Sequence, residues 1–117
     1  MKTILLTLTM LFTGALSYGQ NKNAKASIEV DGVFMMCKKR IEKASLKTKG
    51  VKSASWNVDT HELKLIFDEN KTSLNQIASN VTDVGHDTKS FIASKEAYES
   101  LDPCCKYRDE AVVEDHK

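Results

Sequence analysis

Apolar and polar residues follow two different periods along the first half of the chain. Residues 26–31 alternate strictly between apolar and polar side chains, which is typical of a half-buried strand. From about residue 36 the apolar positions recur four and then three residues apart, and they continue to about residue 48 before a glycine. This spacing places them on one face of a helix. The pattern therefore predicts a strand followed by a helix.

The middle of the chain predicts two more strands and a second helix. Residues 51–58 and 63–67 alternate again, and the short polar turn between them predicts an antiparallel hairpin. Ser73 and Gln76 have the spacing of a capping box, which predicts that a second helix begins there. Apolar residues at helical spacing follow, and Gly85 is expected to end this helix.

The elements after the second helix are weaker. Residues 86–94 predict a fourth strand, although Phe91 and Ile92 are its only large apolar residues. Residues 95–101 predict a short surface helix, and the last dozen residues are charged and expected to fray. The order strand, helix, strand, strand, helix, strand predicts an α+β fold of the ferredoxin-like βαββαβ type. Its four-stranded antiparallel sheet carries both helices on one face.

The first twenty residues have the order of a secretory signal peptide. Lys2 precedes an apolar run over residues 4–16, and small and polar residues follow it. The run is shorter than the roughly 20 apolar residues that a helix needs to span a bilayer. We therefore predict secretion across the inner membrane, cleavage near Gly19 or Gln20, and no stable membrane insertion afterwards. The expected location is the periplasm or cell envelope.

Length and charge exclude several classes of protein. A chain of 117 residues has room for one small domain. Its 17 basic and 16 acidic residues give a net charge of +1, so charge provides no basis for binding a nucleic acid. The 3 cysteines are an odd number, so internal disulfides cannot pair them all. No nucleophile and base constellation or phosphate loop is found, and an enzyme is not expected.

Cys37 lies at the start of the first predicted helix, and its position has two interpretations. The positive end of the helix dipole and the basic residues 38–40 favour a thiolate, which is the form that binds soft metals such as copper(I). Alternatively, Cys37 is a small apolar residue on the buried helix face with Ile41 and Ala44. Residues 38–40 could orient an acidic partner or form a solvated helix face.

The stretch around Cys37 resembles the heavy-metal-associated domain family of soft-metal carriers and copper and mercury transport modules. That family has a Cys-x-x-Cys loop, with an Ile-Glu pair four and five residues past the second cysteine. Ile41 and Glu42 stand at these positions relative to Cys37. Residues 85–87, Gly-His-Asp, are similar to the second signature, a glycine and a ring-bearing residue near the metal loop. The resemblance covers residues 26–92 and implies the same order of elements.

The chain departs from the family pattern at Phe34, where the resemblance expects the first cysteine. The resemblance implies a domain over residues 26–93, after a signal peptide at 1–20 and before a tail at 94–117. That tail contains a Cys-Cys-Lys-Tyr sequence similar to the tails of some secreted bacterial proteins of this type. A tail that folds back over the loop would supply a sulfur in place of the cysteine that is missing at Phe34.

The expected metal ligands combine the loop, the tail and the second signature. They are Cys37, Cys104, Cys105, Met35, Met36 and His86. Each has an alternative: the methionines could be packing filler and the histidine simply exposed. The cysteines could instead form a disulfide from Cys37 to the tail, or a strained vicinal disulfide, because exported proteins meet oxidising conditions.

These residues predict binding of a soft heavy-metal ion, copper(I) foremost, for carriage or sequestration in the cell envelope. The expected partners are the metal ion and a metal-transporting membrane protein or another metal carrier. An alternative function is a structural or interaction module that no longer binds metal and is stabilised by a disulfide between Cys37 and the tail. A thiol oxidoreductase is a third interpretation, but its usual Cys-x-x-Cys is missing.

Overall fold

The computed structural model describes residues 21–115, so the predicted signal peptide at 1–20 lies outside the described residues. No helix among the described residues is long and apolar enough to cross a membrane. The elements follow in the order β1 (Ala24–Glu29), α2 (Met35–Lys47), β2 (Val51–Trp56), β3 (Glu62–Phe67), α3 (Leu74–Asp83), α4 (Lys95–Glu99), the 3-10 turn η1 (Pro103–Cys105) and α5 (Glu110–Asp115).

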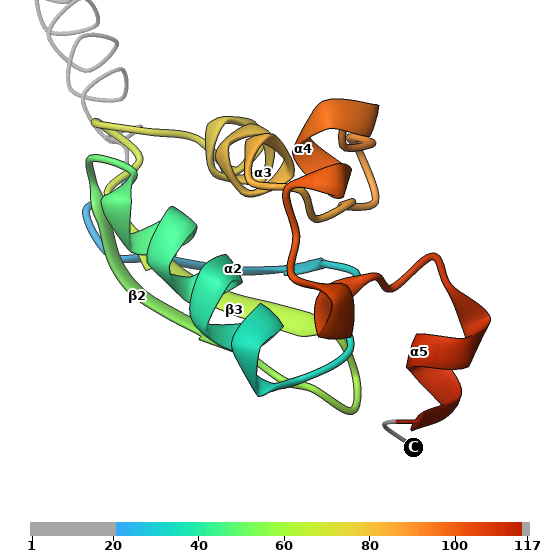
Figure 1. The fold of residues 1–117 in the computed structure, drawn as a ribbon. Helices are drawn as coiled ribbons and strands as arrows, with labels where there is room; N and C mark the ends of the chain where they lie inside the picture. Colours follow the sequence, from blue (N-terminus) through green and yellow to red (C-terminus); the bar gives the residue numbers. More distant parts are fainter. Residues whose placement is uncertain (1–20, 116–117) are drawn as a thin grey trace, which may run out of the picture.

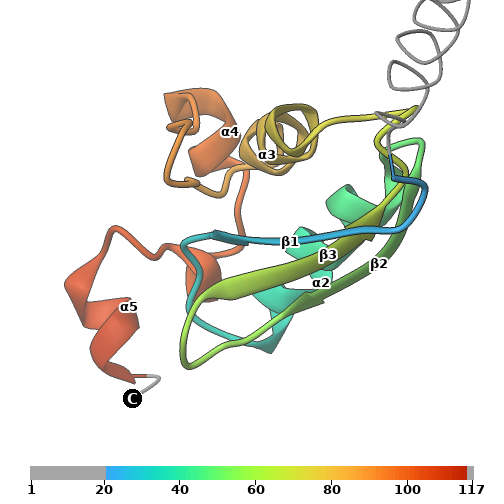
Figure 2. The same cartoon turned by 180° about the vertical axis from the view of Figure 1, so that it is seen from behind.

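Three antiparallel strands form the sheet, with β3 between β1 and β2. Ala26 of β1 lies opposite Leu65 of β3, and Ile28 lies opposite Leu63. Helix α2 lies across one face of this sheet, as both views show (Figure 1 and Figure 2). Since the strand side chains alternate, every second one faces the helices. The resulting core consists mainly of Val30, Ile41, Trp56, Leu63, Leu65, Phe67, Ile77 and Val81.

The predicted fourth strand at residues 86–94 is not confirmed, because the sheet of the described residues has three strands. This segment touches the sheet only at an isolated bridge between Val30 and Thr88. It then turns back on itself, because the Thr88 N–H donates to the Phe91 carbonyl at 2.9 Å and an Asp87 carboxylate oxygen accepts from the Ala93 N–H at 2.6 Å. Ile92 is 80% exposed, so hydrophobic burial contributes little to holding the segment against β1.

The three predicted helices are confirmed within about two residues at their ends, as α2, α3 and the short α4. The Ser73 hydroxyl caps α3 by accepting from the Gln76 N–H at 3.2 Å, which is one half of the expected capping box. The other half is absent, because the Gln76 side chain donates to Asn80 at 3.0 Å instead. Gly85 follows α3 with a φ of +110°, as a helix-ending glycine is expected to do.

The tail does not fray over its whole length. After α4 the chain runs back to the first turn of α2, where η1 packs, and it then forms α5 (Figure 1). Leu101 and Cys105 are buried in the core of the domain. The tail is therefore part of the folded body, and this places its cysteines beside the loop.

Candidate metal centre

Cys37 lies in the first turn of α2 and is completely buried. It shares the buried helix face with Ile41 and Ala44, so the expected apolar environment is confirmed. The loop before it is packed closely: a Cβ atom on Gly32 would lie 3.0 Å from the Trp56 ring and 3.2 Å from the Cys37 Cβ. The thiol is thus held in place by the loop, the helix and the sheet together.

The tail cysteines lie over this thiol. The short turn η1 begins at Pro103, and the Cys105 N–H donates to the Asp102 carbonyl at 2.8 Å. Cys105 is buried in the same core cluster as Cys37, and the Cys37 thiol is close enough to act on its pKa. Cys104 is half-buried, and its Sγ lies 3.4 Å from Met36 Sδ. All three cysteines are free thiols. The structure therefore brings together four sulfur atoms from segments 68 residues apart.

The surroundings of Cys105 raise the pKa of its thiol and so favour its uncharged form. Burial is the main cause that raises the pKa of the Cys105 thiol above its usual range, and the Cys37 thiol acts in the same direction. A negative charge on Cys37 or Cys104 would repel one on Cys105, which raises the pKa of Cys105 further. A soft cation that displaces a proton from these sulfurs removes that repulsion.

Tyr107 and Arg108 attach the tail to the turn after α3. The Tyr107 hydroxyl donates to the Gly85 carbonyl at 2.7 Å and accepts from the Asp87 N–H at 2.9 Å. Arg108 makes a two-armed ion pair with the Asp87 carboxylate, at 2.8 Å from Nη2 and 3.3 Å from Nε. The second signature noted in the sequence is therefore the anchor of the tail.

His86 lies inside the molecule and not at its surface, so the interpretation as an exposed histidine is wrong. Its Nδ1 lies 2.8 Å from the Asp31 carbonyl oxygen, and because that oxygen only accepts, Nδ1 carries the proton. Burial lowers the pKa of His86 from 6.5 to about 4, so the ring is neutral near pH 7. The buried Nε2 has no hydrogen-bond partner among residues 21–115. His86 holds the loop through Asp31, and its role as a metal ligand stays a prediction.

The complete set of six predicted ligands also stays a prediction. Among residues 21–115, no three His, Cys, Asp or Glu side chains gather in an arrangement that could hold a metal ion. Met35 and Met36 are 50% and 45% exposed, so neither is buried packing filler. Phe34 is 40% exposed and provides no side-chain cap for α2. The residues present suit a soft metal, because the donors in contact are thiols and a thioether.

Comparison with known proteins identifies the family. The model of the heavy-metal-associated domain matches residues 36–87. The copper chaperone CopZ of Staphylococcus haemolyticus is 34% identical over 63 residues, which are 53% of this chain and 93% of that protein. This chain belongs to the heavy-metal-associated domain family.

Solved structures agree with that assignment. A CopZ metallochaperone superposes with a TM-score of 0.54 at 26% identity, covering 56% of this chain and 98% of its own. The oxidized MerP of Ralstonia metallidurans CH34 gives a TM-score of 0.55 at 24% identity, covering 57% and 94%, and shows likeness of fold alone. The family match of this heavy-metal-associated domain ends at residue 87, so Cys104 and Cys105 lie beyond it.

The Ile-Glu pair of the heavy-metal-associated domain has a structural role here. Ile41 is buried in the core, and Glu42 accepts from the Trp56 N–H at 2.9 Å. Lys38 joins this contact, since its Nζ donates to Glu42 at 2.6 Å and to the Trp56 carbonyl at 2.7 Å. Arg40 donates to the Val84 carbonyl at 3.2 Å. Two of the three basic residues therefore hold α2 to its neighbours, in contrast to the predicted solvated face.

Sequence reasoning missed the residues that place the tail. Lys106 separates Tyr107 and Arg108 from the cysteine pair, and Tyr107 ends the Cys-Cys-Lys-Tyr sequence, but no periodicity connects either residue with Gly85 and Asp87. These side chains contact backbone groups of Gly85, Asp87 and Ala93 and the Asp87 carboxylate, which many tyrosines and arginines could equally contact. The carboxylate of Asp87, close to the glycine that ends α3, was the only feature of the turn that indicated a binding partner for a basic residue.

Proposed function

We propose that this chain binds a soft heavy-metal ion, with copper(I) as its preferred cargo, and passes it on by ligand exchange without catalysis. The observation that carries the proposal is the docked tail, which places Cys105 against Cys37 and Cys104 against Met36. The tail thus provides a sulfur in place of the loop cysteine that is missing at Phe34. Support also comes from the related CopZ proteins, which are named as a copper chaperone and a metallochaperone.

The arrangement of the sulfurs suits a cargo site. Cys37 and Cys105 are the two buried anchor ligands, while the half-buried Cys104 and the exposed Met36 lie at the rim. An incoming thiolate of a second carrier or of a membrane transporter can reach the rim first and share the ion before the buried sulfurs release it. With the predicted signal peptide, this exchange would take place in the cell envelope.

Titration with copper(I) against a competing chelator tests the proposal on the reduced protein. We expect Cys37→Ser and Cys105→Ser each to lower the affinity by at least about tenfold, which corresponds to about 1.4 kcal/mol. Ala44→Ser is the matched control, because it buries a new hydroxyl on the same face of α2 without removing a sulfur. Equal affinities of the unchanged protein and both cysteine variants would overturn the proposal.

A second candidate is a metal-free module stapled by a disulfide, and the contact between the Cys37 and Cys105 thiols favours it. Mass analysis of the protein isolated from the cell envelope without reductant distinguishes the two. A cargo site predicts three free thiols or bound metal, whereas a staple predicts a loss of two hydrogen masses and one free thiol. A disulfide in the whole population would leave the cargo site without its two buried anchor ligands.

Phe34→Cys is expected to strengthen copper(I) binding by about tenfold or more, because it adds a sulfur one helical turn before Cys37. Phe34 is partly exposed at the N-cap of α2, so its loss removes little core packing. The same competition titration measures the gain, with Phe34→Ser as the control that removes the ring without adding sulfur. A variant with cysteine that binds no more tightly than the variant with serine would contradict the expected site.

A further inference from the structure

The outer edge of β1 has backbone groups without partners among the described strands. The Val30 N–H donates inward to the His61 carbonyl of the β3 hairpin, and the next residue, Asp31, donates outward to the Asp87 carbonyl, each at 2.9 Å. In an antiparallel strand these directions alternate. Lys25 and Ser27 therefore direct their N–H and C=O groups outward, where no described segment forms a strand beside them.

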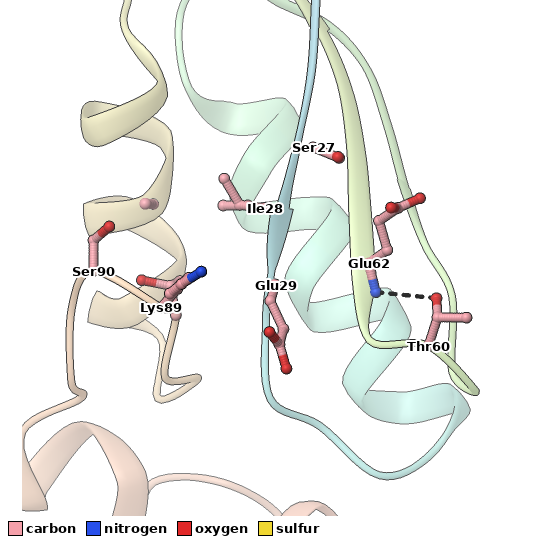
Figure 3. A pocket seen from close by; sticks show the side chains of 9 residues that line it. Ser27, Ile28, Glu29, Thr60, Glu62, Lys89 and Ser90 are labelled. Carbon is pink, nitrogen blue, oxygen red and sulfur yellow. Dashed lines mark hydrogen bonds between the residues drawn. The ribbon is translucent and has the colours of Figure 1, made fainter.

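A groove runs along this edge. It has a volume of about 440 Å³ and is lined by β1, by residues 88–90 with Ala78 of α3, and by Thr60 and Glu62 of the neighbouring hairpin. Figure 3 shows Ser27, Ile28 and Glu29 on the strand and Lys89 and Ser90 across the gap. The segment after Thr88 thus separates from the strand, although it starts beside it.

The bridge between Val30 and Thr88 defines where this segment would lie if it closed the groove. Continued in the same antiparallel register, it places Lys89 opposite Glu29 and Ile92 opposite Ala26. Opposite charges on facing positions stabilise a strand pair. Ile92, which is 80% exposed, would join the side of β1 that faces the helices, where Ala26 is half-buried. Both residues fit a fourth strand in this register.

Contacts within the segment and contacts with the tail together hold it in its present turn. Asp87 accepts from the Ala93 N–H at 2.6 Å, and Arg108 Nη2 donates to Asp87 at 2.8 Å and to the Ala93 carbonyl at 3.2 Å. In an extended strand, residues six apart are about 20 Å from each other. Arg108 cannot contact Asp87 and Ala93 at once in that state, so its clamp and a fourth strand exclude each other.

We propose that Arg108 is a positioning residue: its clamp on Asp87 and Ala93 holds the tail thiols at the loop and, by the same contacts, keeps residues 88–93 off the edge of β1. Loss of the clamp releases both segments. The tail thiols then leave Cys37, and residues 88–93 pair with β1 as a fourth strand.

The consequence for cargo rests on the proposed function. A ligand shifts an equilibrium only through its different affinity for the two states. Metal held between Cys37 and Cys105 can bind only while the tail is clamped, so cargo favours the three-stranded state and its release favours the four-stranded one. The clamp itself is a property of the metal-free protein and is tested without metal.

Arg108→Gln tests the clamp in the reduced protein with a metal chelator present. We expect the amides of Lys25 and Ser27 to gain protection from hydrogen exchange by about tenfold, and the Cys105 thiol to be alkylated about tenfold faster. Lys39→Gln, which removes the same charge from an exposed position of α2, is the matched control. Arg108→Lys retains the charge without the two-armed geometry and should give an intermediate result.

A second substitution identifies the occupant of the groove. Ile92→Asp as a single substitution should leave the hydrogen exchange of Lys25 and Ser27 the same, because Ile92 is already exposed. Combined with Arg108→Gln, it should abolish the gain in protection. Faster alkylation of Cys105 without protection of Lys25 and Ser27 would overturn the competition between tail and strand. So would protection that survives in the double variant. Adding copper(I) to Arg108→Gln should reverse the gain, and failure of this step alone would count against the cargo site and not against the clamp.

Discussion

Gly85→Ala is expected to lower the free energy of unfolding by about 3 kcal/mol, the sum of two effects. Gly85 has a φ of +110°, a conformation that is unfavourable for any residue with a Cβ atom. That Cβ would also lie 2.6 Å from the Ala97 carbonyl oxygen and 2.9 Å from Leu101 Cδ2. The first of these is a backbone atom, so α4 must move, and the tail that follows it moves too. Urea unfolding at pH 7 measures the effect.

Gly50→Ala is the matched control for this substitution. Gly50 has a similar φ of +99°, but the atom that its new methyl group would meet first is the Cβ of the exposed Lys71, at 2.8 Å. This loop residue can shift without moving a helix, so a smaller loss is expected. A Gly85→Ala variant no less stable than Gly50→Ala would show that α4 does not restrict this turn.

The stability of the fold is expected to fall by about 3 kcal/mol between pH 6.5 and pH 4 because of His86. Burial lowers the pKa of His86 from 6.5 to about 4 in the folded state, so the unfolded chain binds a proton over this range and the folded one does not. Stability from the neutral ring is therefore complete above pH 6.5 and is lost as the pH falls toward 4. Urea unfolding at half-unit pH steps measures it.

His86→Gln isolates this contribution, since it retains a donor for the Asp31 carbonyl and does not titrate in this range. The comparison is needed because the Asp31 carboxyl group changes the stability with pH in the opposite direction. Burial is the main cause that raises its pKa, and the nearby Asp87 raises it further. Its contribution to stability is lost as the pH rises. The same decline in stability in both proteins from pH 6.5 to pH 4 would contradict a buried neutral His86.

The periodic elements and the family were predictable from the sequence because they depend on local patterns. The spacing of apolar residues predicted both helices and the hairpin, and the Ile41-Glu42 pair after Cys37 indicated the family to which the chain belongs. A buried place for Cys37 on the face of its helix was one of the two interpretations of this residue, and the structure confirms the burial. A helix face follows from residues three and four apart, so no distant contact is needed to derive it.

The fourth strand shows the limit of such patterns. Residues 86–94 have a weak strand pattern, but their backbone forms a turn because Asp87 accepts from Ala93 and both contact Arg108. These contacts join residues up to 21 positions apart. A competition between a short strand and a tail that arrives from elsewhere in the chain is invisible to a local pattern.

The sequence by itself determined the order of helices and strands, the place of Cys37 at the start of a helix, and the absence of the expected cysteine at Phe34. Only the tertiary structure decided that the tail docks, that Cys105 contacts Cys37, and that His86 is buried as a support of the loop. The physical reason is that these features depend on a few polar contacts between distant segments, chiefly those of Tyr107 and Arg108 with Gly85 and Asp87. Such contacts have no sequence period, and they form only once the folded chain brings the distant segments together.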